Sequence, residues 1–163
     1  MNDYFKVKGN IQAYRVRDGY KELMYEHHNT IGTQLYSNLR DYLITRTGNL
    51  CVEAIAWGSY GYSCGSYKES DYAGTTPYGT QGGLIQSSIG SLQAKFSGTF
   101  SFTSTKQINS FQMGNGYTPA NTGIIKLFTS PYCFDQSMIT ATTYLTYQNG
   151  DKLIIDWTIT IGS

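Results

Sequence analysis

The pentapeptide Gly61-Tyr62-Ser63-Cys64-Gly65 has the G-x-S-x-G spacing of the nucleophilic serine in α/β-hydrolases. In those enzymes the serine lies on a tight turn between a strand and a helix, and an acid and a histidine follow it along the chain. Here the residues after Ser63 are poor helix formers, and both histidines, His27 and His28, precede it. The sequence therefore argues against a hydrolase, and we expect no enzymatic activity and no catalytic residues.

The other groups that could bind a metal or transfer protons show no spacing that marks a site. His27 and His28 are adjacent in a predicted strand, so their side chains point to opposite faces and cannot bind one metal ion together. The eleven carboxylates are scattered along the chain, and sequence alone does not exclude that two of them face one cleft, as in a glycosidase. Asp156, on the polar face of the last predicted strand, is expected to be structural. We expect no metal and no cofactor.

Tyrosine is concentrated in one segment, from Gly58 to Gly83, where glycine, serine and threonine are also abundant and aliphatic residues are almost absent. A long loop inside a compact domain is usually functional or ordered by a partner; the alternative is a disordered surface loop. Tyrosine combines a large contact area with a hydrogen-bonding hydroxyl, which suits both protein interfaces and stacking on sugar rings. With one tyrosine from a second expected loop, over residues 114–122, the candidate partner- or glycan-binding residues are Tyr60, Tyr62, Tyr67, Tyr72, Tyr78 and Tyr117.

Composition narrows the classes of partner. The net charge is +1 and there is no run of lysine or arginine, which argues against nucleic-acid binding. Only 14% of the residues are charged, well below the usual quarter, so neutral surfaces are expected to meet partners. No apolar run is long enough to span a membrane, and the first residues have no signal-peptide pattern, so we expect a soluble intracellular product. Three cysteines without a CxxC spacing, Cys51, Cys64 and Cys133, are expected to be free thiols.

The elements that position these residues are mostly strands. Residues 152–161 alternate between apolar and polar side chains, as a strand with one buried face does. Residues 138–147 alternate as well, and Asn149-Gly150-Asp151 between them is a strong turn signal. The sequence thus predicts a long closing hairpin whose last strand is central to a sheet.

The first part of the chain predicts a hairpin followed by a helix. Residues 7–16 and 21–28 read as strands joined by a turn at Asp18-Gly19. Ile31, Leu35, Leu39 and Leu43 then recur every four residues, which predicts an amphipathic helix over about residues 31–46.

Further strands are predicted over residues 51–57, 92–103, 106–113 and 123–129. About eight strands with hairpins, long loops and one helix fit a mainly antiparallel β-sandwich of jelly-roll or Ig-like type. At 163 residues the chain is expected to be a single domain, 1–163.

The order of these signals resembles that of tailed-phage virion proteins. The resemblance rests on three places: Tyr25–Asn29 running into the helix from Thr30 to Leu43, Ala54–Gly58 followed by a Gly/Thr-rich loop, and the late segments Ser97–Phe102 and Gly150–Ile161. It implies a β-sandwich subunit without enzymatic activity, assembled in many copies. The Tyr-rich insertion departs from that pattern and leaves open whether the protein belongs to the head, as a decoration protein, or to the tail or a fibre.

The sequence thus leads to two alternatives. The first is a virion structural protein, made in the host cytoplasm, whose partners are other copies of itself and other capsid or tail proteins. The second is a carbohydrate-binding, lectin-like or receptor-binding β-sandwich whose partner is a host-surface glycan.

Overall fold

The structure is a computed structural model that describes residues 7–30, 43–44, 54–58, 70–74, 85–90, 92–114, 116–117, 126–127, 133–138 and 143–161. Within these residues the fold is mainly β, as predicted, and every paired strand is antiparallel to its neighbour. The strands of the described chain are β1 (Val7–Arg17), β2 (Tyr20–Thr30), β3 (Ala54–Gly58), β4 (Ser70–Gly74), β5 (Ile85–Gly90), β6 (Gln93–Ser101), β7 (Lys106–Ile108), β8 (Ser110–Gly114), β9 (Gly116–Tyr117), β10 (Lys126–Leu127), β11 (Cys133–Met138), β12 (Leu145–Tyr147) and β13 (Lys152–Ile161).

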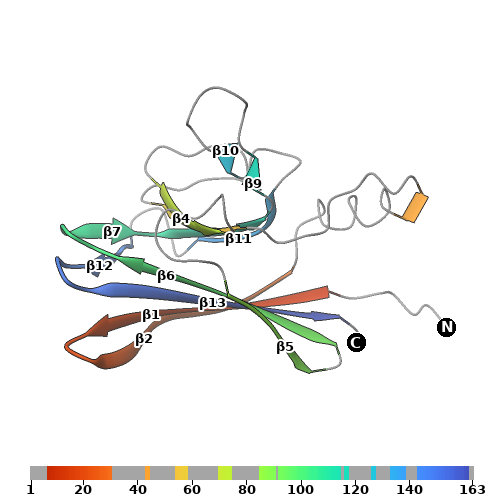
Figure 1. Cartoon of the computed structure of the whole chain (residues 1–163), viewed down its shortest axis with the longest axis horizontal. Helices are drawn as coiled ribbons and strands as arrows, with labels where there is room; N and C mark the ends of the chain where they lie inside the picture. The colour runs from red at the N-terminus through yellow and green to blue at the C-terminus, as the bar shows by residue number, and fades with distance from the viewer. Residues whose placement is uncertain are drawn as a thin grey trace.

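The larger sheet has five strands in the order β2-β1-β13-β6-β5, so the last strand of the chain lies at its centre (Figure 1). β1 pairs along one side of β13 and β6 along the other. The predicted alternation places four side chains of β13 in the core: Leu153, Ile155, Trp157 and Ile159. The central position of β13 is therefore confirmed, and its apolar face is the reason for it.

The N-terminal hairpin is also confirmed. β1 pairs with β2 along its length, and the turn between them contains Asp18 and Gly19 with φ angles of 50° and 82°. Residues of this type tolerate positive φ, which a tight hairpin turn needs. The pairing shifts at Ala13 and Tyr14, where β2 has a bulge.

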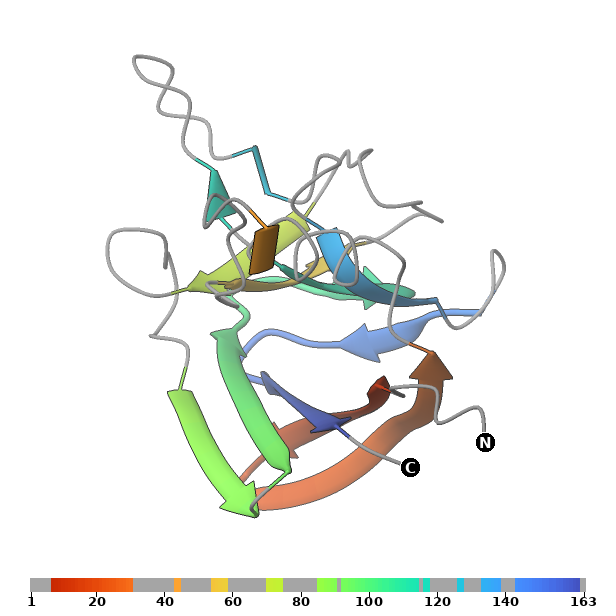
Figure 2. The same cartoon turned by 90° about the vertical axis from the view of Figure 1, so that its right-hand side faces the viewer.

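A second layer consists of the four-stranded sheet β11-β8-β3-β4 and the short ladder β12-β7. The β12-β7 ladder continues the β11-β8 ladder, because Asn109 alone separates β7 from β8. β11 is antiparallel to β8, and β12 is antiparallel to β7. The Asn109 N–H donates to the Gly58 carbonyl (3.0 Å), so the contact with β3 continues across the break. Figures 1 and 2 show this layer over one face of the five-stranded sheet.

Apolar side chains from both layers form one core. Tyr25 of β2 stacks on Phe111 of β8 with ring centroids 5.6 Å apart. Phe102 contacts Trp57 and Tyr147 at centroid distances of 5.5 and 5.2 Å. The buried residues of this core are Val7, Ile11, Ala13, Ile55, Trp57, Phe100, Phe102, Ile108, Phe111, Met113, Tyr147, Leu153, Ile155, Trp157 and Ile159.

The pairing predicted for the closing hairpin is wrong. The turn is present, with Gly150 at a φ of 90°, but β12 pairs with β7 in the second layer, whereas β13 pairs with β1 and β6. Since both sides of β13 are occupied by other strands, β12 has no place beside it. The turn therefore leads the chain from one layer to the other.

The predicted helix and the two predicted loops are tested by the structure only in part. Of the helix expected over residues 31–46, only Leu43 and Ile44 lie within the described residues; their backbone is helical, and both side chains are exposed. The exposure of Leu43 differs from the buried stripe expected there. The ranges expected as loops, 58–83 and 114–122, contain β4 and β9 respectively, and most of their other residues lie outside the described part.

Candidate functional surface

The structure places only two of the six candidate tyrosines. Tyr72 lies in β4, opposite Ala56 of β3, and Tyr117 lies in β9, opposite Lys126 of β10. Tyr60, Tyr62, Tyr67 and Tyr78 lie outside the described residues, as does Ser63 of the G-x-S-x-G motif. The predicted partner- or glycan-binding loop therefore stays a prediction.

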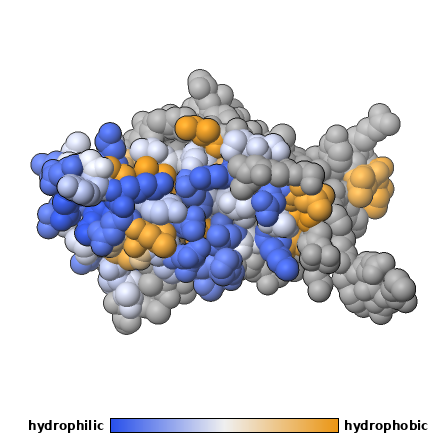
Figure 3. Space-filling view, turned by 90° about the horizontal axis from the view of Figure 1, so that it is seen from below, coloured by the Kyte–Doolittle hydropathy of each residue, from blue (hydrophilic) through white to orange (hydrophobic). Residues whose placement is uncertain are grey.

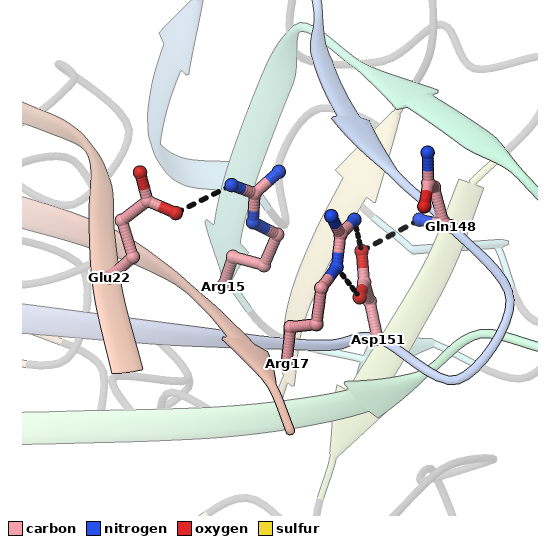
Figure 4. Close-up of polar contacts among 5 residues, drawn as sticks. All are labelled: Arg15, Arg17, Glu22, Gln148 and Asp151. Atoms are coloured by element: carbon pink, nitrogen blue, oxygen red, sulfur yellow. Dashed lines mark hydrogen bonds and ion pairs between the residues drawn. The ribbon is translucent and has the colours of Figure 1, made fainter. Parts of the chain in front are cut away.

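A polar centre that the sequence analysis missed lies where the chain crosses between the layers (Figure 4). The Asp151 carboxylate accepts two hydrogen bonds from the Arg17 guanidinium, at 2.6 Å from Nε and 2.7 Å from Nη2. It also accepts the backbone N–H of Gln148 at 2.7 Å. The Asp151 side chain is 2% exposed and that of Arg17 is 39% exposed. The end of β1 is thereby attached to the turn before β13.

The contacts between Arg17 and Asp151 change the pKa values of both groups. The hydrogen bonds and charge of Arg17, with the Gln148 N–H, lower the pKa of Asp151 to about 2. The same hydrogen bonds to Asp151 raise the pKa of Arg17. The Asp151 carboxylate is therefore ionised at neutral pH and acts as an acceptor for a fixed set of donors, which is a structural role.

Backbone hydrogen bonds complete the crossing. The Gly150 N–H donates to the Phe102 carbonyl at 2.8 Å, and the Phe102 N–H donates to the Asp151 carbonyl at 3.0 Å. The segment after β6 is thus paired with the turn before β13. Beside it, burial raises the pKa of the Tyr147 hydroxyl.

The outer face of the five-stranded sheet carries a second polar network, centred on Asp156. The Ser97 hydroxyl donates to its Oδ1, and the ammonium groups of Lys95 and Lys21 lie 2.8 and 3.9 Å from its Oδ2. The Asp156 side chain is 8% exposed, and side chains of β6 and β2 surround its carboxylate. Asp156 lies on the polar face of β13, as predicted. Its contacts link β13 to β6 and β2.

The network extends over β1 and β2. The Tyr14 hydroxyl donates to Gln12, whose amide donates to Glu26, each over 2.8 Å. The Lys21 ammonium lies 3.8 Å from the centre of the Tyr14 ring, at cation–π distance. This face is therefore mostly hydrophilic, with separate apolar patches (Figure 3).

Apolar side chains are exposed at one end and in both edge strands of this sheet. In β2 they are Tyr20 and Leu23, which are 82% and 47% exposed. Leu92 and Ile161 are 56% and 41% exposed and are adjacent, because the Ile161 N–H donates to the Leu92 carbonyl at 2.8 Å. Ile85, in the edge strand β5, is 66% exposed. Burial of these side chains would require a partner.

Two further observations bear on the kind of site. Within the described residues, His, Cys, Asp and Glu side chains form no group of three that could hold a metal ion. The same part of the chain contains no helix with the length and hydropathy needed to span a membrane.

No protein-family model matches the chain, and neither the curated proteins nor the solved structures include a significant match to it.

Proposed function

We propose that this protein is a non-enzymatic structural subunit of a phage or virus virion, which assembles in multiple copies on the capsid or tail. It would be made in the host cytoplasm and incorporated into the particle. Its partners would be other copies of itself and neighbouring capsid or tail proteins. The resemblance of residues 25–43, 54–58, 97–102 and 150–161 to tailed-phage virion proteins supports this class.

The scaffold of this subunit would be a β-sandwich. Support comes from the shared core, in which β13 and β1 contribute from one layer and β3 and β8 from the other. The contact between Tyr25 and Phe111, at 5.6 Å, joins the two layers directly. Two antiparallel sheets with interdigitated inner faces are the architecture of jelly-roll and Ig-like proteins. Such a scaffold is rigid, which suits repeated assembly.

The observation that carries the proposal is the exposure of large apolar side chains beside an otherwise hydrophilic face. Leu92 and Ile161 are solvent-exposed at one end of the five-stranded sheet, and Ile85 is exposed at its edge. Monomeric proteins usually bury such residues or scatter them, whereas assembling subunits bury them against partners. Low overall charge fits the same reading, since it limits repulsion between copies.

Purified particles provide the test. Particles from the source culture would be banded in a density gradient, and each fraction digested for mass spectrometry. We expect peptides of this protein to peak in the fraction that contains the major capsid protein. Absence from intact particles would contradict the proposal.

The Tyr-rich segment can be tested in the same preparation. If the loop supplies contacts to other virion proteins, then changing Tyr62, Tyr67 and Tyr72 together to alanine should release the protein from the particle. Unchanged attachment, with the variant folded, would remove the loop from the interface. Saturable quenching of tryptophan or tyrosine fluorescence by a glycan would instead favour the carbohydrate-binding alternative.

A further inference from the structure

Edge strands differ in how they discourage pairing with another chain. The two larger sheets have four edge strands: β2, β5, β11 and β4. Charged residues interrupt three of them: β2 contains Lys21, Glu22 and Glu26, β11 contains Asp135, and β4 contains Asp71. Charges on an edge oppose the addition of a further strand, and so do bulges. The pairing of β5 with β6 is irregular only between Ser88 and Gly90, at the end of β5, so residues 85–88 form its regular part. β5, with the sequence Ile-Gln-Ser-Ser-Ile-Gly, is the one edge of these two sheets without a charged residue.

The charged side chain nearest to β5, Lys95 of the neighbouring strand β6, points away from this edge. Lys95 of β6 is paired with Ser87 of β5, so its side chain could reach over this edge. Instead its ammonium group lies 2.8 Å from the Asp156 carboxylate, toward the centre of the sheet. Asp156 in turn is held by the Ser97 hydroxyl. The network on the outer face therefore neutralises the lysine nearest to β5.

Exposure at β5 is compatible with a partner. Ile85, Ser87 and Ser88 are exposed, and Figures 1 and 2 show β5 at the margin of the sheet with no other described strand along its outer side. Serine side chains are small enough to allow close approach of a second backbone. Ile85, at 66% exposure, would be buried in part by that approach.

From these observations we infer that β5 is a self-association edge, which pairs antiparallel with β5 of a second copy about a two-fold axis. The sequence Ile85–Ile89 reads nearly the same in both directions about Ser87. Pairing centred there places Ser87 opposite Ser87 and Gln86 opposite Ser88, and it places Ile85 opposite the irregular position at Ile89. The result is a continuous sheet of five strands from each copy. A two-fold axis is the expected symmetry when one edge meets an identical edge.

This inference deepens the proposed function, because it names the surface through which copies of the proposed subunit meet. The two can fail separately. Self-association is measured on the purified chain, whereas the virion role is measured on particles.

Complementary charge variants test the edge. In the proposed dimer the two Ser87 side chains face each other, so Ser87→Lys and Ser87→Glu should each repel their own copy. Sedimentation velocity over a range of concentrations should show a dimer for the wild type and a dissociation constant at least about tenfold higher for each variant. An equimolar mixture of the two variants should associate again, because lysine then faces glutamate.

Thr99→Lys is the matched control. Thr99 is exposed on the same sheet, in β6, beyond the stretch that pairs with β5, and its change to lysine should leave the dimer intact. Circular dichroism and urea midpoints would establish that each variant folds; if Ser87→Lys does not, Ile85→Lys takes its place. A monomeric wild type, or a dimer weakened equally by Ser87→Lys and Thr99→Lys, would overturn the inference, as would a mixture of the two charge variants that stays monomeric.

Discussion

Asp151 shows how much of the fold can depend on one side chain. It follows the turn that leads from β12 to β13, and it receives Arg17 from the end of β1 and the Gln148 N–H from the turn itself. A buried carboxylate is stable only when its oxygens are paired with donors. Here the three donor groups, two from Arg17 and one from Gln148, come from segments that must be in place for the two layers to be correctly joined.

Removing this carboxylate should destabilise the protein. We expect Asp151→Ala to lower the free energy of unfolding by about 2 kcal/mol, as for other hydrogen bonds to charged groups, with solvent around Arg17 limiting the loss. Urea denaturation followed by circular dichroism would measure it. The matched control is Glu22→Ala: this exposed glutamate pairs with Arg15 at 2.5 Å, and its loss should cost less than about 1 kcal/mol. Equal effects of the two changes would contradict the role of Asp151.

The pKa of Asp151 also predicts a pH dependence. Its pKa is lowered from 3.8 to about 2 in the folded protein. A carboxyl group of this kind contributes stability that is present above its unfolded pKa and is lost as the pH falls through the folded value. The free energy of unfolding should therefore decrease between about pH 4 and pH 2, and less steeply in Asp151→Asn. Urea titrations at a series of pH values would test this; identical slopes in both proteins would argue against it.

At the scale of elements, β13 organises the larger sheet. It is paired on both sides, and Trp157 at its middle is fully buried. We expect Trp157→Ala to lower the free energy of unfolding by about 3–5 kcal/mol, because it removes a large side chain from a closed core. Thr158→Ala, the adjacent change on the polar face, should cost much less. Urea denaturation of both variants would measure the difference, and a similar loss from each would mean that the core does not depend on this strand.

Local patterns predicted where strands and turns lie. The alternation in residues 152–161 predicted β13, and Asp18-Gly19 predicted the first hairpin, because the turn and the strands it joins are adjacent in sequence. The pairing of β12 could not be predicted in this way. A turn signal specifies where the chain reverses, whereas the partner of β12 depends on which strands already occupy both sides of β13.

The polar centres depend on similarly distant contacts. Arg17 and Asp151 are 134 residues apart. Nothing in the sequence around either residue indicates that the other is its partner. The position of Asp151 directly after Asn149-Gly150 was a signal for a turn, but not for an ion pair. β5 was missed for a different reason: its polar Gln-Ser-Ser centre gives little apolar alternation.

At the scale of the whole molecule, the described surface is divided by charge. Ion pairs and hydrogen bonds tie β2, β1, β13 and β6 together on the outer face. Beside them the edge at β5 is uncharged, and apolar side chains are exposed there and at the end of the sheet. Such a surface suits a subunit that is held by copies of itself and by neighbours.

The number of copies per particle tests this account most directly. Particles purified in a density gradient would be digested together with isotope-labelled reference peptides, and this protein would be quantified against the major capsid protein. We expect a reproducible ratio that corresponds to multiple copies per particle and persists through repeated banding. Absence of the protein, or an amount that varies between preparations and is lost on rebanding, would contradict a structural role in the virion.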